Sequence, residues 1–284
     1  MATVNVTSWA EFVQAVGVAG NTVVCPEDAV WDMNQIAPEG VAKITIACDE
    51  IQGNGLEIKN LVSTGGFYIE KAGGTTSAKA EVLISGLSMH NILGYGGSTY
   101  SGTTGFIYAA KNQAVTIRQC SFSGIFANAV HRFYVADESS GNNQGYIYNE
   151  LCALNIELQA SSAQIYRGYT SFKGSRVTAH LPNISGALPL GTTTNIIETN
   201  NEFVVYAPGV TQVTLRGCAA SIVRGNLSAC TSITGGNESA ISIYSTDSAP
   251  NISNPPTTIK GVTDEQMKDA SYLRSIGFII GTEG

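Results

Sequence analysis

The sequence predicts an all-β fold: a right-handed parallel β-helix, a solenoid of stacked coils, with an N-terminal capping helix and a short C-terminal helix. Three observations predict it. Charged residues make up only 13% of the chain and glycine occurs 31 times, a composition typical of short strands joined by many turns. Two short apolar patterns recur along the chain, which indicates a repeat architecture. Each end also carries the signature of a short amphipathic helix.

Composition and charge argue against several classes of function. The chain has 284 residues and a net charge of −7. It contains no lysine or arginine run of the kind that attracts nucleic acid or an anionic membrane. No apolar stretch reaches the roughly 20 residues needed to span a bilayer, and residues 1–7 lack the basic and apolar regions of a secretory signal. We therefore expect no nucleic-acid partner, no membrane insertion and no export signal.

The first recurring pattern is an aromatic-aliphatic run. Its copies are Gly66–Ile69, Gly105–Tyr108, Arg132–Val135, Gln164–Tyr166 and Phe203–Tyr206, with Ile241–Tyr244 as a further copy. The intervals between copies are unequal. Unequal intervals fit coils that carry loops of different length better than they fit the fixed period of a propeller or a leucine-rich repeat.

The second pattern follows the first and reads apolar-x-apolar-x-x-(Cys, Leu or small)-x-apolar. Its copies are Val82–Met89, Val115–Phe122, Tyr146–Ala153, Thr170–Val177 and Val213–Ala220, and Ile44–Ile46 begins in the same way. Residues two apart on a strand share a face, so Val115 and Ile117 are predicted to point inward. The chain then bends, and Cys120 resumes the inward alternation on the next strand. A single coil cannot bury such an inner face, whereas stacked coils can.

The two ends of the chain predict helices that close the solenoid. Ser8–Glu11 matches a capping box with Ser8 as N-cap, and apolar residues continue at helical spacing up to Gly17. Thr263–Gln266 is a second capping box, which follows an extended proline-containing linker and precedes another apolar stripe. We therefore divide the chain into a β-helix with its cap helix over 1–250, and a C-terminal linker and capping helix over 251–284.

Six cysteines occur without a C-x-x-C pair. They are Cys25, Cys48, Cys120, Cys152, Cys218 and Cys230. Their apolar surroundings favour small buried thiols in a reducing compartment. Disulfide bonding remains the alternative.

Several segments resemble the pectate-lyase-like superfamily of right-handed parallel β-helices over roughly residues 7–245. They are the opening Thr7–Val16, the strand Asn21–Val24 and the coil Val115–Gly124. The combination is also similar to structural proteins of bacteriophages and phage-like particles. The closing Thr263–Leu273 is similar to segments that end β-helical repeats in bacterial surface proteins. The resemblance implies a tail, fibre or capsid-decoration component that forms a homotrimer, folds in the bacterial cytoplasm and resides in the virion or particle.

Two short segments are predicted to bind a ligand. Tyr95 and Tyr100 lie in a Gly/Ser-rich loop, where tyrosine offers apolar area and a hydroxyl at small entropy cost. His131 and Arg132 form a dipeptide with the chemistry to hold an anionic group. The alternative interpretations are a solvated connecting loop and a polar coil edge. No catalytic residue, metal ligand or cofactor site is predicted.

The sequence therefore favours a non-enzymatic structural or attachment protein. Its expected partners are copies of itself, other particle proteins and a host-surface glycan. Two alternatives remain: a polysaccharide-degrading lyase or hydrolase resembling a tailspike depolymerase, and a bacterial surface adhesin. Glycoside hydrolysis needs two positioned carboxylates, and Glu150 with Glu157 is the pair that the spacing offers for this second reading.

Overall fold

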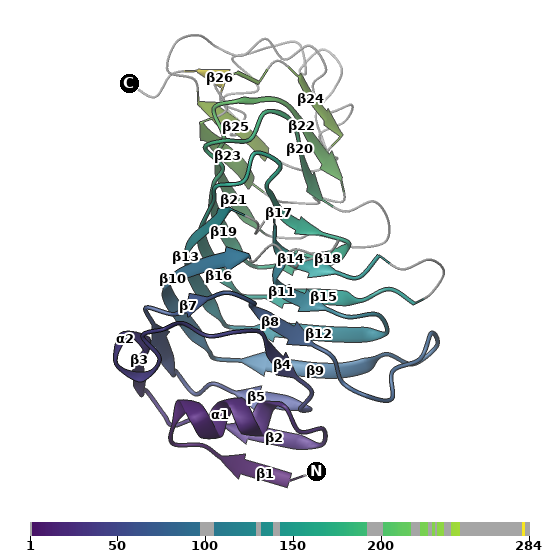
Figure 1. The fold of residues 1–284 in the computed structure, drawn as a ribbon. Helices are drawn as coiled ribbons and strands as arrows, with labels where there is room; N and C mark the ends of the chain where they lie inside the picture. Colours follow the sequence, from purple (N-terminus) through teal and green to yellow (C-terminus); the bar gives the residue numbers. More distant parts are fainter. Residues whose placement is uncertain are drawn as a thin grey trace.

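The protein is an all-β solenoid of parallel strands (Figure 1). The structure is a computed structural model that describes residues 2–96, 105–128, 132–138, 143–191, 201–216, 222–226, 229–230, 232–235, 240–244 and 280–281. Neighbouring strands come from successive coils and pair in parallel, for example β9 (Ala80–Ser85) with β12 (Gln113–Arg118). The predicted fold class is confirmed.

The strands form four sheets, which we name by their size. The 7-stranded sheet contains β1 (Ala2–Asn5), β2 (Asn21–Val24), β5 (Glu50–Gln52), β9, β12, β15 (Tyr146–Glu150) and β18 (Tyr169–Lys173). The 5-stranded sheet contains β4 (Ile44–Ile46), β8 (Phe67–Ile69), β11 (Gly105–Ala109), β14 (Arg132–Ala136) and β17 (Gln164–Arg167). The 3-stranded sheet contains β20 (Gly186–Gly191), β22 (Val210–Arg216) and β24 (Ser232–Gly235).

The 11-stranded sheet runs along most of the solenoid. Its strands are β3 (Val30–Asp32), β6 (Glu57–Lys59), β10 (Ser88–Gly96), β13 (Ser121–Asn128), β16 (Ala153–Leu158), β19 (Arg176–His180), β21 (Glu202–Tyr206), β23 (Ile222–Asn226), β25 (Ala240–Tyr244) and β26 (Ile280–Gly281), with β7 (Val62–Ser63) beside β10. From β8 to β19 the chain visits the 5-, 7- and 11-stranded sheets in turn. From β20 to β25 the described strands alternate between the 3-stranded and 11-stranded sheets, and β26 pairs with β25 in the 11-stranded sheet.

Four of the predicted repeat copies lie in other sheets than the remaining copies of their pattern. Phe203–Tyr206 and Ile241–Tyr244 belong to the 11-stranded sheet and not to the 5-stranded sheet that holds the other aromatic-aliphatic runs. Ile44–Ile46 lies in the 5-stranded sheet, and Val213 lies in the 3-stranded sheet. Apolar alternation shows that a strand has a buried face, but every sheet of the solenoid shares that alternation.

The core is a continuous column of inward side chains. Two of its rows in the 7-stranded sheet are Val82, Val115, Ile147 and Thr170, and Ile84, Ile117, Asn149 and Phe172. Val115, Ile117, Ile147 and Phe172 are each 0% exposed. Phe133 on β14 packs against the rings of Phe106, Phe122 and Phe126 and so joins the 5-stranded to the 11-stranded sheet. Burial of these stacked apolar faces is the main force that holds successive coils together.

A short helix covers the N-terminal end of this column, as predicted. Helix α1 (Trp9–Val16) begins after Ser8, whose Oγ accepts a hydrogen bond from the Glu11 N–H at 3.3 Å. The Glu11 carboxylate accepts in return from the Thr7 N–H at 2.8 Å. Trp9 packs edge-on against Trp31 of β3, and a one-turn helix, α2 (Met33–Ile36), follows that strand. The predicted C-terminal linker and helix lie outside the described residues.

A bend with a left-handed residue joins the 7-stranded to the 11-stranded sheet in successive coils. Gly86, Gln119, Leu151 and Gly174 occupy this position, with φ between 53° and 63°. The N–H of Gln119 donates to the Glu150 carbonyl at 2.9 Å, and that of Leu151 to the Lys173 carbonyl at 2.9 Å. The hydrogen-bond ladder between coils therefore continues around the corner.

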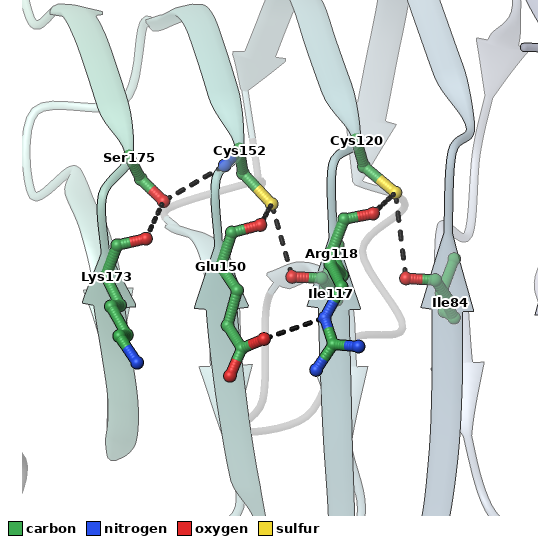
Figure 2. Close-up of polar contacts among 8 residues, drawn as sticks. All are labelled: Ile84, Ile117, Arg118, Cys120, Glu150, Cys152, Lys173 and Ser175. Carbon is green, nitrogen blue, oxygen red and sulfur yellow. Dashed lines mark hydrogen bonds and ion pairs between the residues drawn. The ribbon is translucent and has the colours of Figure 1, made fainter.

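Thiols line the inside of the same corner. Cys120 Sγ donates to the carbonyl oxygens of Ile84 and Arg118, and Cys152 Sγ to those of Ile117 and Glu150 (Figure 2). Ser175 occupies the equivalent place in the next coil and accepts from the Cys152 N–H at 3.1 Å. The five cysteines within the described residues are free and buried, as expected. Burial raises the pKa of the Cys120 thiol to about 12.

The corner predicts that Leu151→Gly stabilises the protein. Leu151 has φ 56° and its side chain is 60% exposed. A left-handed conformation costs a residue with a β-carbon roughly 1 kcal/mol. The change to glycine removes this cost, and it leaves no cavity in the core because the Leu151 side chain is exposed. Urea denaturation should show a free energy of unfolding higher by about 1 kcal/mol. Leu151→Ala keeps the β-carbon and should give no such gain. An equal gain in both variants would contradict the strain argument.

The thiol corner predicts a loss of stability in alkali. Burial raises the folded-state pKa of Cys120 from 9.0 to about 12. The buried thiol therefore contributes fully to the free energy of unfolding below pH 9, and this contribution is lost as pH rises toward 12. Urea denaturation from pH 7 to 11 measures this loss. The free energy of unfolding of the wild type should fall more steeply than that of Cys120→Ala, by up to about 1.4 kcal/mol per pH unit. Parallel declines in the two proteins would show that this thiol titrates alike in both states.

Candidate functional site

Tyrosines gather on the outer face of the 7-stranded sheet. Along β15, Ile147 and Asn149 are buried, so the alternating residues Tyr146 and Tyr148 point outward. Tyr169 of β18 pairs with Tyr146 across the two coils. We call Tyr146, Tyr148 and Tyr169 the tyrosine surface.

The three rings form one aromatic area. The centroids of Tyr146 and Tyr169 are 5.0 Å apart with an interplanar angle of 38°. Those of Tyr146 and Tyr148 are 6.1 Å apart and nearly parallel at 12°. Tyr148 is 37% exposed, so part of this aromatic area faces solvent. Burial raises the pKa of the Tyr148 phenol, and the neighbouring Tyr146 and Glu81 add to the effect. Its hydroxyl therefore stays protonated at neutral pH and can both donate and accept hydrogen bonds.

Polar groups border the tyrosine surface on the side of β12. Lys79 Nζ lies 5.4 Å from the centroid of the Tyr146 ring and donates to Asn112 Oδ1 at 3.3 Å. The β12 residue between Glu81 of β9 and Tyr146 of β15 is Ala114, and Thr116 holds the equivalent place beside Tyr148. The small side chains of Ala114 and Thr116 thus separate the tyrosines from the Glu81 row.

An ion pair borders the tyrosine surface at the end of the strands. Arg118 Nε donates to Glu150 Oε2 at 2.8 Å, two residues beyond Tyr148 (Figure 2). Lys173 lies beside Glu150 in the next coil and is exposed. The surface therefore offers apolar ring faces together with hydroxyl, ammonium and carboxylate groups. This mixture suits a ligand that is apolar on one face and rich in hydroxyl groups at its edges.

Two of the sequence-predicted binding residues, Tyr95 and Arg132, lie on other sheets than this surface. Tyr95 lies at the end of β10, in the 11-stranded sheet, and its side chain is outside the described residues; so are Tyr100 and His131. Arg132 begins β14 in the 5-stranded sheet.

The carboxylates considered as a catalytic pair lie on different sheets. Glu150 ends β15 in the 7-stranded sheet and pairs with Arg118. Glu157 lies on β16 in the 11-stranded sheet and accepts a hydrogen bond from Gln159 Nε2 at 3.0 Å. The bend between β15 and β16 separates them, so their separation of seven residues does not place them on one face.

The tyrosine surface was not predicted from the sequence. Tyr146–Ala153 was interpreted only as a copy of the second recurring pattern, which describes the buried face of the strand. The signal was present as two tyrosines at i and i+2 on the face opposite to Ile147. Their contact with Tyr169 depends on the register between β15 and β18, which the sequence does not state.

In the described part of the chain, no three or more histidine, cysteine, aspartate or glutamate residues are grouped to hold a metal ion. Among the same residues, no helix has the length and apolar character required to cross a bilayer.

Comparison of the chain with protein-family models, with curated proteins and with solved structures gives no match.

Proposed function

We propose that this chain is a structural and attachment protein of a bacteriophage or phage-like particle, and that it binds a host-surface glycan through the tyrosine surface. The observation that carries the proposal is the contact of Tyr146, Tyr148 and Tyr169 on the outer face of the 7-stranded sheet. The solenoid supplies the rigid support, and the rings with their polar border supply the recognition.

The chemistry of a glycan fits these groups. A pyranose ring presents C–H groups on its faces, which pack against an aromatic ring, and hydroxyls at its edge, which bind polar side chains. Tyr146 and Tyr169 lie on neighbouring coils, and strands in a sheet are about 4.8 Å apart. Consecutive sugar units of a chain laid along the solenoid would meet one ring and then the other.

The role in a particle draws on the resemblance described above and on the architecture. A capped solenoid with a continuous core is a rigid rod whose outer faces remain available to partners. The proposal includes homotrimer formation and contact with other particle proteins, as in the proteins that the sequence resembles. The protein folds in the bacterial cytoplasm before assembly under this proposal.

Binding to an array of bacterial surface glycans, followed by calorimetry with the best ligand, tests the proposal. Tyr146→Ala and Tyr169→Ala should each weaken binding about tenfold, because each removes a ring that the ligand packs against. Tyr148→Phe should separate the contribution of the hydroxyl from that of the ring. The matched control is Tyr206→Ala, because Tyr206 is 40% exposed but lies on the 11-stranded sheet.

Two outcomes would contradict the proposal. One is that no glycan on the array binds. The other is that Tyr206→Ala weakens binding as much as the changes in the tyrosine surface do. Incubation of the bound glycan with the protein should leave its chain length unchanged. New reducing or unsaturated ends would instead establish the depolymerase alternative.

A further inference from the structure

Arg132 stands out among the arginines because its described partner is neutral. Its Nε donates to the Gln164 Oε1 of the next coil at 2.8 Å. The side chain is half-buried. By comparison, Arg118, Arg167 and Arg176 each pair with a glutamate. A guanidinium has five N–H donors, and within the described residues Arg132 uses one of them.

A second arginine adds positive charge at this place. Burial lowers the pKa of Arg132, the nearby charge of Arg167 lowers it further, and the Glu138 carboxylate opposes both effects. Arg167 Nε itself donates to Glu138 Oε2. Glu138 is therefore engaged by Arg167, whereas the described hydrogen bond of Arg132 goes to the neutral amide of Gln164.

Asp137 directly follows β14 and accepts a hydrogen bond from the Tyr108 hydroxyl at 2.5 Å, and the segments that border β11 and β14 beyond it add no further acid. Residues 97–104, 129–131 and 139–142 adjoin β11 and β14 in the sequence and include neither aspartate nor glutamate. Arg132 forms no ion pair within the described residues, and a partly buried charge without such a pair is unfavourable. An anion from solution would neutralise it, and the planar guanidinium fork matches the oxygens of a carboxylate, sulfate or phosphate.

We propose that Arg132, positioned by Gln164 and assisted by Arg167, binds an oxyanion on the 5-stranded sheet. The ligand is a carboxylate, sulfate or phosphate group, either free or carried on an acidic sugar. The site is separate from the tyrosine surface, which lies on the 7-stranded sheet. A negative result at one site would therefore not contradict the proposal for the other.

Thermal denaturation at constant ionic strength tests this site, with sodium sulfate, phosphate or glucuronate replacing chloride. The wild-type protein should show a saturable rise in its melting temperature with at least one of these anions. Gln164→Glu is the decisive variant. It places a carboxylate beside Arg132 Nε without changing the size of the side chain. It should raise the melting temperature in chloride and weaken anion binding at least tenfold.

Two further variants keep the result interpretable. Arg132→Lys keeps the charge but loses the planar fork, so it should also bind at least tenfold more weakly. Arg176→Gln removes an arginine on the 11-stranded sheet and should leave anion binding unchanged. Binding of glucuronate without phosphate or sulfate would support the acidic-sugar form of the site, and similar binding of all three would support a general oxyanion site. The proposal is overturned if no anion gives a saturable shift over chloride, or if Gln164→Glu binds as tightly as wild type.

Discussion

The structure depends on one constraint: each coil must place its inward side chains on those of the coil before it. Parallel pairing in constant register produces this alignment, as in the row Val82, Val115, Ile147 and Thr170. The backbone hydrogen bonds then run between coils, and the apolar faces are buried between sheets. The outer face inherits the same alignment. Tyr146 lies beside Tyr169, and Arg118 beside Glu150, because their coils are in register.

At the bends between sheets, the alignment of the coils requires backbone conformations that some of the residues there disfavour. The four bends from β9 to β10, β12 to β13, β15 to β16 and β18 to β19 each contain one residue with positive φ. Glycine meets the need in two coils, whereas Gln119 and Leu151 adopt the conformation at a cost. The ladder of hydrogen bonds around the corner and the buried thiols inside it hold these residues in place. Tertiary packing therefore overrides the local preference of Gln119 and Leu151.

The sequence predicts the class of fold better than its details. Alternation at Val115 and Ile117, and the capping box at Ser8, identify a buried strand and a capping helix from local signals alone. The pattern does not tell which sheet a strand joins, as Phe203–Tyr206 shows, because alternation is common to every sheet and the number of strands in a coil changes after β19. The tyrosine surface was missed for a related reason. It combines residues of two coils, so it depends on a register that local patterns do not contain. Arg132 was found as a charged residue, but its neutral partner Gln164 lies 32 positions away and emerges only from the fold.

The change in cross-section after β19 has a mechanical consequence. In a solenoid, tension along the long axis is carried by the hydrogen bonds between coils, since these point along that axis. From β8 to β19 three ladders share the load at every level, whereas beyond β19 the described strands form two. Both proposed ligand-binding faces lie in the part with three ladders. A pull exerted through a bound ligand would therefore act on the better-reinforced section, and rupture would begin among the coils nearer the C-terminus.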